Sequence, residues 1–261
     1  MTSIVAIRCT DGVVVAADSS ATFGDGNHIR TIEQPTDRKI EIIGDKIIIA
    51  GTGYVGHHQR FTEKIKQLWD ANAFKNMDGL EFAKTLARAG LEEFSATHPH
   101  ILEYAAFVAF DDMKSKTPVL CELPRGAMHP SVQMPPAFQP EIKDPKDHLW
   151  FASAGSGQPI TDPFLALFRE VFWKDGPPDL QGGKFTALWA LKHACDVNPG
   201  GIKGPIKMAV LEPAKNGHMA RKLNDDDQAE LENMVSDATA HFAGFKDVLL
   251  GKEDAADVPK P

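Results

Sequence analysis

Short apolar runs rich in β-branched residues alternate with polar turns over the first fifth of the chain. One pair of runs occupies residues 4–7 and 13–17, and a second pair occupies 40–43 and 46–50. Each pair is joined by a short polar segment that contains glycine, a residue that tolerates the positive φ angles of tight turns. The pattern therefore predicts two antiparallel hairpins.

Apolar residues recur every three or four positions in four later segments. Residues 61–68 and 83–94 carry this spacing, and so do 164–172 and 185–195. A period near 3.6 places the apolar side chains on one face of a helix. We therefore expect two pairs of amphipathic helices.

A capping signal precedes the third of these helices. Asp162 and Pro163 lie directly before its apolar face, and aspartate favours the N-cap whereas proline favours the first turn. We expect the helix to begin at this dipeptide. An apolar run at 149–152, followed by Gly155, Ser156 and Gly157, predicts a strand before it.

Two further pairs of apolar runs predict hairpins. The first pair lies at 102–111 and 118–123, and the second lies at 206–211 and 218–223. Strands joined by short turns rather than helical crossovers form antiparallel sheets. The expected fold class is α+β, with two antiparallel sheets between layers of helices, and the proline-rich segment 124–147 is a loop insertion.

Length and charge describe the rest of the chain. Its 261 residues are 43% hydrophobic, which is enough for one sizeable domain, at 2–223. Residues 225–261 carry ten acidic and three basic side chains, so this acidic helix and polar tail (224–261) contributes −7 of the net charge of −8. The remainder is almost neutral and offers no basic face, so we expect no nucleic-acid partner.

The sequence contains no signal for a membrane, a metal or a disulfide framework. No segment stays apolar long enough to span a bilayer, and we expect a cytoplasmic protein. Cys9, Cys121 and Cys195 lack the CxxC spacing of metal or redox pairs, so we expect them to be buried apolar residues. We expect His57 and His58 at surface or helix positions without a metal, and no cofactor.

Gly51, Gly53 and Gly56 match the GxGxxG pattern of dinucleotide-binding turns. That motif requires a following parallel strand and an acidic ribose ligand, whereas here one predicted helix leads into another and Asp70 falls within a helix. A purely structural glycine turn is a second interpretation. We favour a third, in which backbone N–H groups of the turn point into a reaction site.

Thr2 follows Met1, and a small second residue is what methionine aminopeptidases generally require. Removal of Met1 would give Thr2 a free α-amine beside its hydroxyl group. A model α-amine has a pKa of about 7.7 to 8.0 and can accept the hydroxyl proton directly or through water. We expect no pro-segment before Thr2 and therefore no autocleavage.

The stretch TSIVAIRCTDGVVVAAD, read from Thr2 to Asp18, resembles the mature N-terminus of proteasome β-subunits and their bacterial relatives. The resemblance extends to about Leu211. It implies a four-layer α/β/β/α sandwich of the N-terminal nucleophile hydrolase type. It also implies a threonine peptidase with Thr2 as its nucleophile.

The same resemblance assigns roles to three further residues. Lys39 corresponds to the buried ammonium near the threonine hydroxyl, and Asp18 corresponds to its carboxylate partner. A fixed positive charge favours deprotonation of a hydroxyl and an amine, and a carboxylate reduces the cost of burying it. Gly51 corresponds to the residue whose backbone N–H binds the oxyanion.

Ser156 and Asp196 resemble the pair that hydrogen-bonds around the threonine amine. The sequence departs from the family where Pro199 replaces a serine of this network and where Ser20 replaces an arginine, and the stretch from 22 to 37 is longer than the family norm. We expect weak, tuned or narrow activity. The family's specificity pocket corresponds to three residues, which indicate a preference for small to apolar side chains: Ala21, Ile49 and Gly53.

Family resemblance also implies an assembly. We expect homo-oligomeric stacked rings that enclose the sites and act on peptides or unfolded proteins, with an ATPase or other activator as an open possibility. The start of the chain resembles HslV-type peptidases, whereas the 124–147 loop and the C-terminal segment resemble the β-proteobacterial homologues. An amidase acting on a small amide and a catalytically weak ring scaffold are the alternatives.

Overall fold

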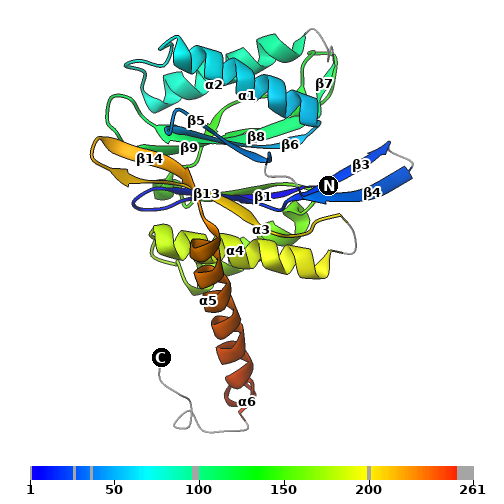
Figure 1. The fold of residues 1–261 in the computed structure, drawn as a ribbon, viewed down its shortest axis with the longest axis vertical. Coiled ribbons are helices and arrows are strands. Elements are labelled where there is room, and N and C mark those ends of the chain that lie inside the picture. The colour runs from blue at the N-terminus through cyan, green and yellow to red at the C-terminus, as the bar shows by residue number, and fades with distance from the viewer. Residues whose placement is uncertain (1, 26–27, 36–37, 96–99, 199–200, 252–261) are drawn as a thin grey trace. The chain divides into compact units, whose positions relative to one another are not determined.

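The computed structural model describes the chain except for residues 1, 26–27, 36–37, 96–99, 199–200 and 252–261. The chain divides into two compact units, Met1–Leu223 and Asn224–Pro261. The first unit contains both large sheets and four long helices (Figure 1). The second contains α5 (Asp225–Gly244) and α6 (Lys246–Leu249).

The first five-stranded sheet contains the start of the chain. Its strands lie in the order β12-β1-β2-β13-β14, and every neighbouring pair is antiparallel. The hairpin predicted from the first pair of apolar runs forms the centre of this sheet. The strands are β1 (Ser3–Arg8), β2 (Val13–Ala17), β12 (Phe151–Gly155), β13 (Lys207–Ala214) and β14 (Gly217–Lys222).

The second five-stranded sheet is also antiparallel, with the order β11-β9-β8-β6-β5. Two of the predicted hairpins form it, and the short β11 extends its edge. The strands are β5 (Ile40–Ile43), β6 (Ile47–Gly53), β8 (Tyr104–Asp111), β9 (Pro118–Leu123) and β11 (Glu141–Ile142).

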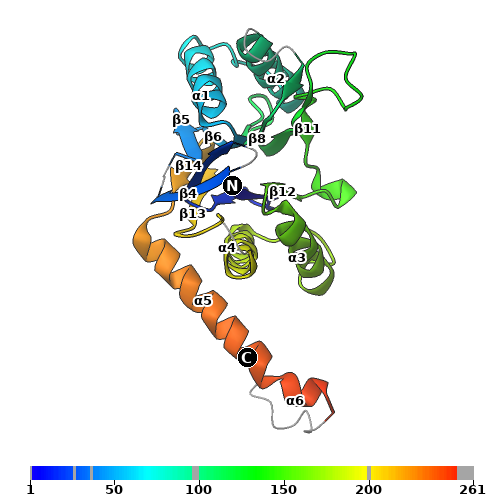
Figure 2. The same ribbon diagram turned by 90° about the vertical axis from the view of Figure 1, so that its right-hand side faces the viewer.

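Two pairs of helices cover the outer faces of the stacked sheets. Helices α1 (Val55–Asp70) and α2 (Gly79–Ser95) lie on the sheet that contains β6 and β8, and α3 (Gln158–Val171) and α4 (Leu180–Val197) lie on the other sheet (Figures 1 and 2). The result is the predicted four-layer α/β/β/α arrangement. Its fold class is α+β.

Alternation along β6 separates two apolar cores. Ile47 and Ile49 pack in the core beneath α1 and α2, whereas Ile48 and Ala50 pack between the two sheets. All four side chains are fully buried. Successive residues of a strand face opposite sides of its sheet, so Gly51 continues the face that lies toward the helices.

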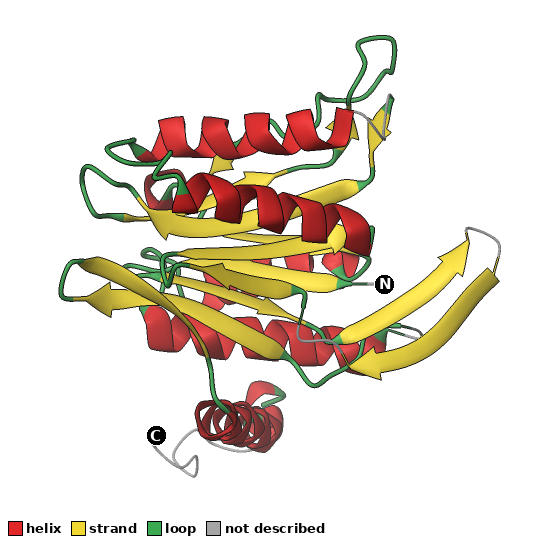
Figure 3. Cartoon of the chain, turned by 45° about the horizontal axis from the view of Figure 1, so that its top comes forward, coloured by secondary structure: helices red, strands yellow, loops and turns green. Residues whose placement is uncertain are grey.

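A two-stranded hairpin, β3 (Ser20–Asp25) and β4 (His28–Pro35), follows the first sheet. It projects beyond the stacked sheets, beside the start of β1 (Figure 3). No hairpin was expected here, because the segment lacks the long apolar runs that mark the other strands. The unusual length of the stretch from 22 to 37 therefore corresponds largely to this hairpin.

Helix α3 begins earlier than its capping signal indicated. It starts at Gln158 after the N-cap Gly157, and Pro163 lies inside it. The expectation that Asp162 caps this helix is wrong. The first-turn proline is Pro159 instead, while Asp162 accepts hydrogen bonds from Gln158 and from the hydroxyl of Ser153.

The proline-rich segment 124–147 contains little regular structure. Its strand β10 (Gly126–Ala127) pairs with β7 (Ile101–Leu102), and a short 3-10 helix spans Pro145–Asp147. Lys143 joins this segment to the second sheet through ion pairs at 2.7 Å with both Glu122 and Glu141. The insertion is therefore attached to the edge of the sandwich by a half-buried charge cluster.

Candidate functional site

Asp18 follows the last residue of β2 and is fully buried. One carboxylate oxygen accepts the backbone N–H of Ser3 at 2.8 Å, and the other accepts that of Ser20 at 3.2 Å. The ammonium of Lys39 lies 2.6 Å from the first oxygen. Three donors therefore compensate the charge that burial would otherwise destabilise.

Lys39 lies immediately before β5 and extends toward the first sheet. Its side chain is 12% exposed. Burial lowers the pKa of its ammonium below the ordinary value of 10.5, and the opposing carboxylate of Asp18 offsets only part of this effect. The site thus contains a desolvated cation held by one carboxylate, the environment in which a lysine acts most strongly on a neighbouring hydroxyl.

Thr2 and Ser156 contact each other at the junction of β1 and β12. The backbone nitrogen of Thr2 donates to the Ser156 hydroxyl at 3.1 Å, and this hydroxyl lies 3.3 Å from the Thr2 carbonyl oxygen. Gly157 donates its N–H to the same carbonyl at 3.3 Å. The register that pairs Ser3 with Gly155 brings these segments together.

Gly51 lies within β6, not in a loop after it. Its N–H donates to the carbonyl oxygen of Lys39 at 3.3 Å, as the last rung between β5 and β6. This bond is longer than the usual 2.9–3.0 Å. An incoming oxyanion would therefore compete with a weak backbone acceptor for this donor.

Five of the six predicted catalytic residues are linked by hydrogen bonds or an ion pair, with Ser3 as the link between Thr2 and Asp18. Ser156 contacts Thr2, the adjacent Ser3 contacts Asp18, Asp18 pairs with Lys39, and Lys39 accepts from Gly51. The sixth, Asp196, is exposed near the end of α4 and makes no hydrogen bond with Thr2 or Ser156 in the described part of the chain. Pro199 lies outside the described residues.

The three residues expected to shape a specificity pocket lie in different environments. Ile49 is fully buried in the core beneath α1 and α2. Ala21 is half-buried in β3, and Gly53 is exposed at the end of β6 with a φ of 118°. Their role in substrate selection stays a prediction.

Cys195 is a neighbour of the site that sequence reasoning missed. It is partly exposed, whereas Cys9 and Cys121 are buried as expected. Burial raises the pKa of its thiol to about 11, with further contributions from the negative charges of Asp18 and Asp196. The thiol is therefore protonated near neutral pH.

The contact of His58 with Tyr104 behind Gly51 was also missed. His57 and His58 occupy the first turns of α1, as a helix position allows, but both are buried. Nδ1 of His58 lies 2.9 Å from the hydroxyl of the buried Tyr104. A histidine pair in a polar helix start offers no sequence signal for burial, because the covering β8 strand is distant in sequence.

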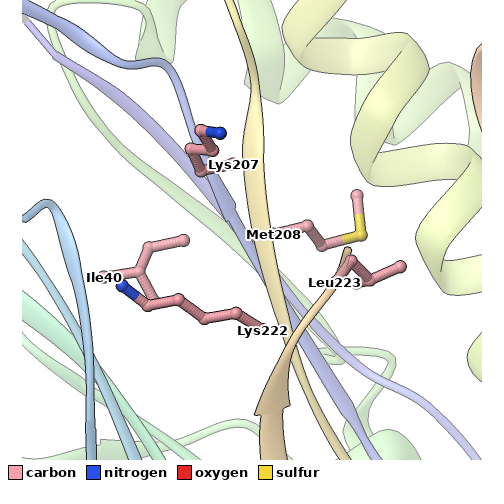
Figure 4. Close-up of a pocket in the computed structure, with 5 residues that line it drawn as sticks. All are labelled: Ile40, Lys207, Met208, Lys222 and Leu223. Atoms are coloured by element: carbon pink, nitrogen blue, oxygen red, sulfur yellow. The ribbon is translucent and has the colours of Figure 1, made fainter. Parts of the chain in front are cut away.

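Two cavities open on the first unit, and none of the six predicted catalytic residues lines either of them. One, of about 190 Å³, lies where β5 and β14 form the neighbouring edges of the two sheets, and Figure 4 shows Lys222 extending toward Ile40 there. The other, of about 360 Å³, is lined by four polar residues. Its lining is His148, Arg169, Glu170 and Lys174.

No group of three or more His, Cys, Asp or Glu side chains in the described part of the chain is arranged to hold a metal ion. No helix among the described residues has both the length and the apolar character needed to span a membrane.

The sequence model of proteasome subunits matches residues 1–115. The N-terminal part of this chain matches the proteasome subunit family. That match includes Thr2, Asp18, Lys39 and Gly51, while Ser156 and Asp196 lie beyond it. A proteasome subunit beta from Nanoarchaeum equitans (strain Kin4-M) is 32% identical over 90 residues, which span 33% of this chain and 43% of the archaeal protein.

A solved structure matches almost the whole chain at the level of the fold. The Gly-1 mutant of Anbu from Hyphomicrobium sp. strain MC1 superposes with a TM-score of 0.65. The superposition covers 94% of this chain and 97% of Anbu, at 17% sequence identity. The predicted four-layer fold of the N-terminal nucleophile hydrolase type is therefore confirmed.

The buried imidazole of His58 predicts a pH-dependent stability. Burial lowers its pKa from 6.5 to about 4, so between these values the unfolded chain binds a proton that the folded chain does not. The free energy of unfolding should therefore fall as the pH falls through this window. Complete titration of this one group corresponds to about 3 kcal/mol.

Urea unfolding at pH 7.0 and 4.5 measures this loss. We expect it to be about 2 kcal/mol smaller in His58→Gln than in the wild type. The exposed His148 provides a control, and His148→Gln should retain the full loss. An equal loss in His58→Gln and in the wild type would contradict the prediction.

Proposed function

We propose that this chain is a threonine-type peptidase of the proteasome family, with Thr2 as its nucleophile after removal of Met1. The supporting observation is that Ser3, the residue directly after Thr2, donates its backbone N–H to the buried Asp18–Lys39 pair. Burying a carboxylate and an ammonium costs desolvation energy, so such a pair often adds little to stability. Its position beside a potential N-terminal threonine supports catalysis.

In the proposed reaction the Thr2 hydroxyl oxygen attacks the carbonyl carbon of a peptide bond, and the α-amine accepts the hydroxyl proton. The Lys39 cation stabilises the negative charge on the attacking oxygen, and the Gly51 N–H stabilises the tetrahedral oxyanion. Collapse of the intermediate breaks the C–N bond, and the α-ammonium returns the proton to the leaving amine. Water then hydrolyses the acyl-enzyme ester, with the α-amine as base.

The proposal includes an assembly and a setting. We infer a homo-oligomeric ring stack in the cytoplasm that acts on peptides or unfolded proteins, and a β-proteobacterial type of proteasome homologue related to HslV-type peptidases. The four-layer fold and its likeness to Anbu support this inference, as does the 124–147 insertion. An ATPase partner has no support among the described residues.

Intact mass spectrometry after treatment with a β-lactone probe tests the proposed function. Ring opening transfers the whole probe to the attacking oxygen, so we expect a species that lacks Met1 and carries one probe, with the adduct mapped to Thr2. Retained Met1, or an adduct on another residue, would overturn the mechanism. Sedimentation should report an assembly, whereas a reactive monomer would favour an amidase for small amides.

A catalytically weak ring scaffold is the second candidate function. It is favoured by two observations, the engagement of the Gly51 N–H with the Lys39 carbonyl and the absence of a hydrogen bond from Asp196 to Thr2 or Ser156 within the described residues. Both would lower transition-state stabilisation. A folded assembly with Thr2 exposed at its N-terminus that forms no adduct would support this alternative.

A further inference from the structure

The helix-facing side of Gly51 is occupied by two buried polar side chains. A Cβ atom on Gly51 would lie 2.4 Å from the hydroxyl oxygen of Tyr104 and 2.5 Å from Nδ1 of His58. Real Cβ atoms do not approach other atoms so closely. The backbone of Gly51 therefore rests on this pair and cannot move toward α1 without displacing it.

His58 and Tyr104 form one hydrogen-bonded unit, with 2.9 Å between Nδ1 and the phenol oxygen. Their exposed fractions are 8% and 1%. A neutral imidazole has one donor nitrogen and one acceptor nitrogen. Burial favours this neutral form, because it lowers the pKa of His58 to about 4.

The backbone of Arg38 also interacts with the imidazole of His58. Its interaction with the imidazole opposes the effect of burial and favours the charged form of His58, as a carbonyl acceptor facing an N–H does. Arg38 directly precedes Lys39, so this interaction connects His58 to the Lys39 segment.

The pair thus connects the two backbone segments that supply the proposed reaction site. The Tyr104 hydroxyl is hydrogen-bonded to Nδ1 of His58 beneath Gly51, and the same imidazole interacts with the backbone of Arg38, the residue before Lys39. The Lys39 carbonyl in turn accepts the N–H of Gly51. One buried side chain of α1 therefore lies behind Gly51 and interacts with the residue before Lys39.

We propose that His58 and Tyr104 are positioning residues, which hold the Gly51 N–H and the Lys39 segment in the geometry that the reaction requires. This inference rests on the proposed function. Neither side chain reaches substrate, because both are buried behind the backbone. Their loss should therefore reduce the rate of the chemical step and leave probe binding unchanged.

Inactivation kinetics with the β-lactone separate these two effects. We expect Tyr104→Phe, which removes one oxygen atom, to lower the maximal inactivation rate about 10- to 100-fold at an unchanged probe half-saturation concentration. His58→Leu should have a similar effect, and the double variant should be little worse than either single variant, because both act through one contact. His58→Asn, which retains an acceptor near the Nδ1 position, should recover part of the rate.

His218 provides a matched control at the other end of the sheets. It is 9% exposed, and its Nδ1 lies 2.8 Å from the buried carboxylate of Asp111. His218→Asn disturbs a buried imidazole of the same kind, yet it should inactivate at the wild-type rate. Wild-type rates in Tyr104→Phe and His58→Leu would overturn the positioning role while leaving the proposed function intact.

Hydrogen exchange keeps the inference testable if the wild type does not react with the probe. Amide exchange of peptides covering residues 48–53, followed by mass spectrometry, measures how well the hydrogen bond from the Gly51 N–H to the Lys39 carbonyl is protected. Positioning predicts faster exchange there in Tyr104→Phe and His58→Leu, but not in His218→Asn. Unchanged exchange in both variants would overturn the inference, whereas an unreactive wild type with faster exchange in the variants would overturn only the proposed peptidase.

Discussion

Replacing Thr2 by Ala is expected to abolish β-lactone labelling and to lower peptide hydrolysis by at least about 1,000-fold. The substitution removes the attacking oxygen but retains the α-amine and the backbone contact with Ser156. Thr2→Ser retains a hydroxyl group and should still form the adduct, more slowly. Intact mass and the rate of release of a fluorogenic peptide product measure these effects.

Thr10→Ala is the matched control for this experiment. Thr10 is an exposed threonine in the turn between β1 and β2, and its described contact is through the backbone. Both alanine variants should unfold within about 0.5 kcal/mol of the wild type, because neither substitution removes core packing. Labelling that survives in Thr2→Ala would place the nucleophile elsewhere in the chain.

The sheets were predictable because local pattern and tertiary pairing agree in them. The apolar runs at 4–7 and 13–17 form the central hairpin, since both faces of these strands are buried and continuous apolar runs mark such strands. The strand expected at 149–152 is instead Phe151–Gly155. Its limits depend on pairing with β1, a long-range contact that the local pattern does not contain.

Two other misses have local causes. Helix α3 has two candidate first-turn prolines, and Pro159 rather than Pro163 occupies that position. The β3–β4 hairpin has a mixed polar sequence and a register irregularity between Ala21 and Phe23, so period-2 alternation is weak there.

The candidate site was likewise predicted only in part. The pairing of Asp18 with Lys39 was expected from the family resemblance and is present in the structure. The support behind Gly51 was not, because it depends on the register that pairs Gly53 with Tyr104 across β6 and β8. Family motifs name residues that touch the reacting atoms, whereas the residues behind them follow from packing in this particular chain.

Lys39→Met should reduce both stability and reactivity. It leaves the fully buried Asp18 carboxylate with two backbone donors and no ion-pair partner, a change that costs about 3 to 5 kcal/mol in comparable buried pairs. It also removes the cation proposed to stabilise the Thr2 oxygen, so the maximal inactivation rate should fall about 100- to 1,000-fold. Urea unfolding and β-lactone kinetics measure the two effects separately.

Lys143→Met separates loss of a buried ion pair from loss of the proposed catalytic cation. Lys143 is 7% exposed and contacts both Glu122 and Glu141. Burial lowers the pKa of both ammonium groups. Two carboxylates outweigh this effect at Lys143 and raise its pKa, whereas the single carboxylate beside Lys39 leaves the pKa of Lys39 lowered. Lys143→Met should therefore be destabilised while its folded fraction reacts at the wild-type rate. If Lys39→Met also reacted at the wild-type rate, the Asp18–Lys39 pair would stabilise the fold without contributing to the reaction.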